Sequence, residues 1–458
     1  MKILVLGDRG KAHAIVWKLF NSSHPIEMVC APGNGGTAQL VPSAVPPIRS
    51  TAEICHWALA EGFSLIIPAE PIYLQVGLAD EAAAFRLPVF GAPQRAAQLE
   101  QSRLWAKDFL LRHGIPTPDG RPFSDLRTAE KYLAGHQPPV VLRGDLPLEP
   151  EGIYGDRYSA MRALEQMFAA PLPPGHLRGA IVEAYTPGPR VAFSAISDGE
   201  HVLPLLPVRL YDRLGAGEQG RHAPAMGAHI SNSQLVPALA RQLFQRLIQP
   251  LVEAMHREGV RIRGLLGIDC ILAADGPLVT DIRCSWSALE AQVLLPRLAG
   301  DLLPIIEAAL SGRLAALPPL RWNPQASVAL GLVMEGYPDQ GGDGIVVSGL
   351  ADIDPGTLVF HSQTTTPYGL RYIPSATTAN KPDIIETIAS SLTEALGGRS
   401  PAAPGDILSS ISTTGREVLA IVALGATLPE ARARAYANAS RIHFQGRTFR
   451  PDIAEREL

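Results

Sequence analysis

The sequence predicts a multidomain protein that combines α/β and α+β folds and begins with a doubly wound parallel sheet. Its 458 residues, 46% of them hydrophobic, suffice for about three domains with separate cores. The first 97 residues alternate short apolar runs with helix-like segments, a pattern typical of βα units. A small α/β segment follows at about 115–178, residues 179–318 indicate a larger antiparallel sheet with helices, and the C-terminal part is a mixed α/β region.

The first unit is a strand, a glycine-bearing turn and a helix. Residues 3–6 form an apolar run, and residues 7–10 read Gly-Asp-Arg-Gly before a helical segment. A second strand, residues 28–30, leads into the loop Ala-Pro-Gly-Asn-Gly-Gly-Thr-Ala at residues 31–38. Loops at the ends of adjacent parallel strands define a pocket, and a helix N-terminus offers N–H groups to an anion. We therefore predict that this pocket takes a small anionic ligand.

Later elements follow from the same periodicities. We expect further strands and helices at the ranges listed here: strands 65–67, 89–90, 265–272, 278–284, 327–334, 358–361 and 418–424, and helices 52–61, 76–86, 96–113, 233–258, 289–310 and 429–439. A helix-like segment and a Pro-, Gly- and Ser-rich stretch near residues 366–405 are interpreted as a surface insertion.

The composition is that of an ordinary soluble protein. The formal net charge of -4 gives no electrostatic argument for a nucleic-acid or membrane partner. The sequence contains no run of about 20 apolar residues and starts directly with a strand, so we expect a cytoplasmic protein. Its four cysteines have no CxxC spacing, and we expect them to be reduced.

Several motifs together resemble the glycinamide ribonucleotide synthetase family, also called phosphoribosylamine–glycine ligase, of the ATP-grasp superfamily. The opening keeps Gly7, Gly10 and His13 of the family's GxGGREHA, and residues 31–38 match APGNxGTA. Matching stretches continue to the C-terminus, at residues 89–118, 197–207, 226–228, 359–364 and 423–453. The chain is therefore identified as a divergent member of this family.

The resemblance implies four segments: an N-terminal domain (1–97), a small ATP-grasp subdomain with a linker (98–178), a large ATP-grasp subdomain (179–318) and a C-terminal mixed α/β domain (319–458). It also implies a carboxylate–amine ligase that uses ATP and Mg²⁺ to form an acyl phosphate, which an amine attacks. The expected partners are small-molecule amines and carboxylates, and the expected assembly is a monomer or homodimer.

The nucleotide side departs from the family. Arg103 and Arg143 stand where the family has phosphate-binding lysines, although the hinge retains Glu183 and Tyr185. The family's glycine-rich lid is replaced at residues 145–152 by Asp-Leu-Pro-Leu-Glu-Pro-Glu-Gly, whose prolines remove N–H donors. We therefore expect weak binding of ATP and Mg²⁺.

The expected metal hairpin also departs. Two apolar strands joined by Ala-Asp-Gly at 274–276 place Asp269 roughly opposite Asp281. Arg283 stands where ATP-grasp enzymes have an asparagine, and it shares a face with Asp281 because side chains alternate along a strand. We predict that its guanidinium lies against Asp281 or Asp269, although a weak metal site at the two aspartates stays open.

Other residues receive their roles from the resemblance alone. Arg213, Arg283 and Glu290 are the candidate catalytic residues. The candidate substrate-binding residues are Gly7, Gly10, Lys11, His13, Gly33, Asn34, Gly36, Thr37, Gly415 and Arg416. The candidate nucleotide-binding residues are Arg103, Arg143, Glu183 and Tyr185.

Two functions follow from this mixture of retained and lost motifs. The first is an ATP-dependent ligase repurposed from purine biosynthesis to another amine or amino acid. The second is a catalytically degenerate homologue that binds a phosphorylated metabolite or a partner protein. Because the sugar-phosphate side is better preserved than the ATP side, we expect no housekeeping role in purine synthesis.

Overall fold

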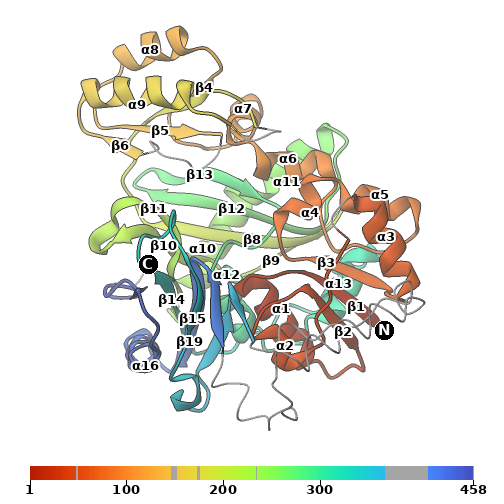
Figure 1. Cartoon of the computed structure of the whole chain (residues 1–458). Coiled ribbons are helices and arrows are strands. Elements are labelled where there is room, and N and C mark those ends of the chain that lie inside the picture. The colour runs from red at the N-terminus through yellow and green to blue at the C-terminus, as the bar shows by residue number, and fades with distance from the viewer. Residues whose placement is uncertain (48–49, 146–151, 173–175, 234, 367–410, 457–458) are drawn as a thin grey trace, which may run out of the picture.

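The computed structural model describes residues 1–47, 50–145, 152–172, 176–233, 235–366 and 411–456. Figure 1 shows an N-terminal α/β unit, a small sheet with two helices at the top, and a large sheet through the centre. The predicted insertion near 366–405 and the predicted lid at 145–152 lie outside the described residues, apart from their ends. The predicted combination of α/β and α+β folds is confirmed.

A parallel three-stranded sheet, ordered β2-β1-β3, begins the chain. It consists of β1 (Lys2–Gly7), β2 (Glu27–Pro32) and β3 (Leu65–Pro68), with α1 (Gly10–Phe20), α2 (Thr37–Leu40), α3 (Thr51–Ala60), α4 (Pro71–Gln75) and α5 (Leu78–Ala84) around it. The strand predicted at 89–90 forms only one parallel bridge, from Val89 to Ile66. The pairing ends there because the next N–H, that of Gly91, donates to the backbone oxygen of Arg263 in the large sheet.

The helix predicted at 96–113 is two helices, α6 (Gln94–Gln101) and α7 (Arg103–Arg112). Ser102 between them has an extended backbone, and its Oγ accepts the N–H of Trp105 as the cap of α7. The same hydroxyl donates to Asp145 over 2.6 Å. The break therefore results from a serine that caps one helix and binds the neighbouring subdomain.

The small sheet has the order β4-β7-β5-β6. Its strands are β4 (Gly120–Phe123), β5 (Val140–Gly144), β6 (Gly152–Tyr154) and β7 (Ala180–Ala184). The helices α8 (Leu126–Ala134) and α9 (Arg157–Ala169) cover one face of this sheet (Figure 1), where Leu133 and Leu164 are buried against it. The core of the small subdomain lies between this face and the two helices. The opposite face of the sheet is directed at the large sheet (Figure 1).

The large sheet is antiparallel and has the order β13-β12-β8-β10-β11-β14-β19-β16, with β9 on β8 and β20 on β14. Its strands are β8 (Arg190–Asp198), β9 (Val202–Pro204), β10 (Val208–Gly215), β11 (Gln219–Ile230), β12 (Arg263–Ala273), β13 (Gly276–Arg283), β14 (Ala326–Met334), β16 (Leu358–His361), β19 (Glu417–Gly425) and β20 (Arg447–Thr448). Through the pairing of β11 with β14, this sheet crosses the predicted boundary at 318/319.

The helices packed on this sheet are α10 (Val236–Leu243), α11 (Gln249–Arg257), α12 (Glu290–Leu294), α13 (Leu303–Leu310) and α16 (Leu428–Ala439). Two predicted helices are interrupted. The 233–258 helix contains a π segment at Phe244–Ile248, since Pro250 has no N–H to continue the usual ladder, and the 289–310 helix breaks after Leu294 at Pro296.

The remaining elements are short. A second small sheet, ordered β15-β18-β17, holds β15 (Gly342–Val346), β17 (Thr364–Thr365) and β18 (Ser412–Gly415). The 3₁₀ turns are Ala216–Glu218, Leu295–Arg297, Leu314–Ala316 and Leu350–Asp352. Within the described ranges, no helix is both long and apolar enough to span a membrane.

Candidate active site

The β12–β13 hairpin provides the two aspartates that the sequence predicts as partners. The strands pair in antiparallel register, with Asp269 directly opposite Asp281 and a bulge immediately after Asp269. The predicted opposition of these residues is therefore confirmed. Their side chains line a cavity of about 220 Å³, together with residues of α6, α7, β8, β10 and β11.

Arg283 occupies the space between two carboxylates. Its Nε lies 3.0 Å from Oδ1 of Asp269, and its Nη1 lies 2.9 Å from Oε2 of Glu290. Glu290 is fully buried and also accepts bonds from the Ser194 hydroxyl and the Ser287 N–H. Burial alone would lower the pKa of Arg283, but Asp269 and Glu290 raise it, so the guanidinium is a fixed positive charge. The predicted contact of Arg283 with Asp269 is confirmed.

Asp281 is held by arginines from three other elements. Arg103, at the start of α7, donates from Nε to Oδ1 over 3.0 Å, and Arg143 of β5 donates from Nη2 to the same oxygen over 2.5 Å. Arg190 of β8 places Nη2 at 3.8 Å from Oδ2. Burial raises the pKa of Asp281, but Arg143, Arg103 and Arg190 outweigh it and hold that pKa well below its usual range. The carboxylate is therefore ionised, with Oδ1 bonded to two arginines and Oδ2 beyond hydrogen-bond distance of Arg190.

A second cavity of about 120 Å³ lies beside the predicted hinge. Its lining includes Arg143, Glu183, Tyr185 and Arg213. Glu183 is buried and accepts a 2.7 Å bond from Nζ of Lys107, which also donates to Thr117, whereas Tyr185 is exposed. Arg213 donates to the backbone oxygen of Gly220 over 3.2 Å. The hinge thus borders an open space, although its carboxylate is already paired with Lys107.

The glycine-rich loop after β2 is connected to the C-terminal part of the chain. The Asn34 amide donates to the backbone oxygens of Asp8 and His361, and its Oδ1 accepts the N–H groups of Gly36 and Thr37. A Cβ on Gly36 would lie 2.2 Å from the His13 ring, so only glycine fits there. These contacts give the retained motif a structural reason, while its predicted role in ligand binding stays a prediction.

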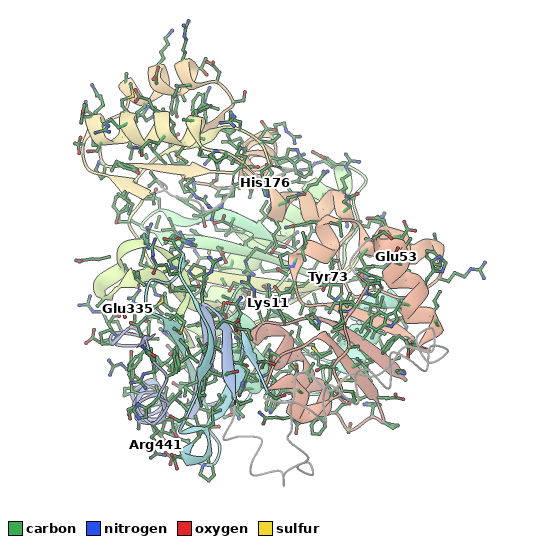
Figure 2. All side chains as sticks on the ribbon, viewed as in Figure 1. Lys11, Glu53, Tyr73, His176, Glu335 and Arg441 are labelled. Atoms are coloured by element: carbon green, nitrogen blue, oxygen red, sulfur yellow. The ribbon has the colours of Figure 1, made fainter. Side chains whose placement is uncertain are left out.

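The other candidate substrate-binding residues are distributed around this junction. Nζ of Lys11 lies 3.2 Å from Glu70, and Lys11 is at the centre of the molecule in Figure 2. Gly7 and Gly10 allow Ala12 and Gln292 to pack closely, and Gly33 has a φ of +78° that favours glycine. Gly415 packs on Gln363, and Nη1 of Arg416 donates to the Pro338 oxygen over 2.5 Å. Their roles toward a ligand also stay predictions.

Comparison with known proteins decides the family. Three domain families of phosphoribosylglycinamide synthetase match the chain: the N domain at residues 1–100, the ATP-grasp (A) domain at 101–291 and the C domain at 327–456. The chain belongs to this phosphoribosylglycinamide synthetase family. Similar proteins include phosphoribosylamine–glycine ligases of Caulobacter vibrioides (31% identical) and Allochromatium vinosum (32%), each aligned over 100% of this chain and 99% of the relative.

A solved structure shows the same fold. The crystal structure of phosphoribosylamine–glycine ligase from Thermotoga maritima matches with a TM-score of 0.75, covering 99% of this chain and 100% of that chain at 20% identity. The predicted membership of the phosphoribosylglycinamide synthetase family and the ATP-grasp fold are therefore confirmed. At this identity the likeness extends to the fold and not to the site.

The residues present do not fit a magnesium ion of the ATP-grasp kind. Such an ion needs carboxylate oxygens that are free to face it in an octahedral shell. Asp269 and Glu290 already face the guanidinium of Arg283, and Oδ1 of Asp281 faces Arg103 and Arg143. Within the described part of the chain, no three His, Cys, Asp or Glu side chains converge as a metal group would. In this protein, the carboxylates that would bind the metal ion are bound by arginine side chains instead.

The sequence did not single out several residues that line the larger cavity. Asp212 and His222 come from β10 and β11, and Glu100 and Gln101 come from α6. A charged residue within a strand, such as Asp212 in Arg-Leu-Tyr-Asp-Arg, is the only signal that the sequence offers. Glu100 accepts from Cys284 and Ser285 of the hairpin end, a contact that depends on tertiary packing.

Proposed function

We propose that this family member binds a small metabolite in its cleft without magnesium-dependent activation of a carboxylate. This is the second of the two functions that the sequence indicates. The observation that supports it best is the position of Arg283, bonded to both Asp269 and Glu290. A guanidinium has no acceptor and is not deprotonated in proteins, so it cannot give up this place to a metal by losing a proton.

The surrounding charges support the same proposal. A transferred phosphoryl group is stabilised by cations whose donors are directed at its oxygens. Here Arg103 and Arg143 are the candidates for this task, and both direct donors at Asp281. A nucleoside triphosphate would have to displace these buried ion pairs, and the cost of displacing them opposes its binding.

A ligase repurposed for another amine or amino acid is the second candidate. It is favoured by the cavity at the hinge, where Glu183 and Tyr185 line an open space next to Arg143. If this candidate is correct, ATP supplies the phosphoryl group, and arginines replace part of the metal's charge. We propose small-molecule amines and carboxylates as partners of the repurposed ligase, and a phosphorylated metabolite or a partner protein for the degenerate homologue. Under both candidates we propose a cytoplasmic protein that is a monomer or homodimer.

Titration calorimetry with magnesium-ATP separates the two candidates. We expect a dissociation constant of a millimolar or higher, which corresponds to a binding free energy no more favourable than about -4 kcal/mol. In parallel, release of ADP is measured with mixtures of amino acids and amines, and the Caulobacter vibrioides relative serves as positive control. Micromolar binding together with amine-dependent ADP release would overturn the proposal and establish the repurposed ligase.

A further inference from the structure

The larger cavity is lined by more negative charge than positive charge. Among the described residues around it, the carboxylates are Glu100, Asp145, Asp212, Asp269 and Asp281, and the guanidinium groups are Arg103, Arg190 and Arg283. The cavity also contains His222. A cleft with this balance attracts cations and disfavours the polyphosphate that an ATP-grasp cleft accommodates.

Most of these carboxylates are fully occupied by the protein. Asp145 accepts from Ser102, Leu104 and Leu177, and Glu100 accepts from the hairpin end. Asp269 is held by Arg283. These groups set the potential of the cavity but offer few acceptors to a ligand.

Asp212 and Asp281 are different because each has an oxygen left over. Oδ1 of Asp212 and Oδ2 of Asp281 are buried and have no hydrogen-bond partner among the described residues, since Nη2 of Arg190 stays 3.8 Å from Oδ2 of Asp281. Asp212 is only 6% exposed, and its Oδ2 pairs with Nε of Arg190 at 2.6 Å and lies 3.6 Å from Nε2 of His222. A buried carboxylate oxygen without a donor is costly, so these two atoms indicate a missing donor.

The carboxyl group of Asp212 is ionised. Burial raises the pKa of this carboxyl, but Arg190 and the hydrogen bond from His222 lower it further, so the pKa lies far below its ordinary value. Asp212 is therefore an anion at neutral pH, and a cationic donor satisfies it better than a neutral one.

We propose that this cavity binds a small organic cation whose ammonium group is held by Asp212 and Asp281. The proposal rests on the proposed function, since magnesium-ATP in the same cleft would compete for these carboxylates. The apolar side chains of Leu99, Leu210, Ile282 and Leu289 also line the cavity and suit a short hydrocarbon chain attached to the ammonium. A volume of about 220 Å³ limits the ligand to a small molecule.

A series of four-carbon probes tests the charge requirement on the full-length protein. n-Butylamine, 1,4-diaminobutane, butanol and sodium butyrate are titrated by calorimetry and by ligand-observed NMR. We expect both amines to bind and the alcohol and carboxylate to bind at least about tenfold more weakly, because only the amines donate charge-assisted hydrogen bonds to the carboxylates. Equal binding of all four probes, preference for butyrate, or no binding of the amines would overturn the proposal.

Two substitutions locate the site. Asp212→Asn should weaken n-butylamine binding about tenfold or more, since it removes the buried charge while keeping the shape. The control Asp275→Asn removes a carboxylate from the exposed turn of the same β12–β13 hairpin and should leave binding unchanged. Equal affinity in Asp212→Asn and the wild type would overturn the proposal, and the probe series on the wild type decides the question if Asp212→Asn does not fold.

Failure of the cation site can be distinguished from failure of the proposed function. If the amines fail to bind while magnesium-ATP is also not turned over, the cation site is wrong and the proposed function stands. If magnesium chloride displaces n-butylamine, the cavity is a metal site and the cation proposal fails. Turnover of magnesium-ATP overturns the proposed function whatever the amines do.

Discussion

The backbone N–H of His361 donates to Nδ1 of His13 over 2.9 Å. This bond connects α1 of the N-terminal segment to β16 at the far edge of the large sheet. Since Nδ1 is the acceptor, His13 must carry its proton on Nε2 and be neutral. Protonation of Nδ1 would break the connection between these two parts of the chain.

Acid should therefore destabilise the protein between pH 6.5 and 4. Burial lowers the pKa of His361 from 6.5 to about 4, and burial, together with His361, lowers that of His13 as well. The unfolded chain then binds more protons than the folded one in this window. The stability contributed by His361, about 3 kcal/mol, is complete above pH 6.5 and is lost as the pH falls to about 4.

Melting temperatures measured between pH 4.5 and 7.5 check this expectation. His361→Asn should flatten the dependence, because the variant has no group to protonate at this position. His443→Asn, at an exposed position, should keep the wild-type dependence. An unchanged slope in His361→Asn would show that other groups control the acid response.

Gly36→Ala should lower the melting temperature strongly. The added Cβ would lie 2.2 Å from the His13 ring and 2.7 Å from that of His361, and the backbone around it is fixed by Asn34. Overpacking of this kind costs about 1–3 kcal/mol or more. The matched control is Gly300→Ala, where a Cβ meets no atom within 4 Å. Similar melting temperatures for the two variants would contradict the close packing of this loop.

Arg283→Asn should create a dependence on divalent cations. The change leaves Asp269 and Glu290 without their shared buried partner, so the variant should be less stable by about 3–5 kcal/mol. Added Mg²⁺ or Mn²⁺ should restore part of the melting temperature, because uncompensated carboxylates recruit a cation. The measurement is a thermal melt with and without metal.

The exposed arginine at position 321 provides the control for this experiment. Arg321→Asn and the wild type should show no more than a small response to the metal. A wild-type protein that gains as much from Mg²⁺ as Arg283→Asn would indicate that Arg283 swings away and that the metal site persists.

Lys107→Met should destabilise the hinge by about 3–5 kcal/mol, because it leaves the carboxylate of Glu183 buried and unpaired. The double variant Lys107→Met, Glu183→Leu should recover most of this loss, since two apolar side chains need no partner. The melting temperatures of both variants and of Glu183→Leu complete the cycle. A double variant that is no more stable than Lys107→Met would contradict a direct pair.

The sequence was sufficient wherever neighbours along the chain decide the geometry. The turn at 274–276 fixes the hairpin register as far as Cys270 opposite Val279, and Arg283 on the same face as Asp281 follows from strand alternation. The bulge after Asp269, which brings this residue opposite Asp281 in place of Thr280, is not specified by the turn. The order of strands and helices in the first βα units follows in the same way from the spacing of apolar residues and from the glycine-bearing turns.

Contacts between distant elements were not available from the sequence. Arg103 and Arg143 were expected to bind phosphate separately, yet both reach Asp281, because α7 and β5 face the end of the hairpin. Asp212 lies in the cavity because β10 runs two strands from β12 in the large sheet. The break at Ser102 depends on Asp145 of another segment, which a helical period does not reveal.

The pairing of β11 with β14 makes the C-terminal segment a cover for an otherwise open strand edge. Residues 227–230 of β11 pair with residues 327–330 of β14. A chain cut at the predicted boundary after residue 318 would expose these backbone groups on a long, mostly buried strand. Such an edge is a template for intermolecular pairing, so the shortened protein would self-associate into aggregates. Protection of this strand edge from intermolecular pairing is therefore a contribution of the C-terminal segment to the whole chain.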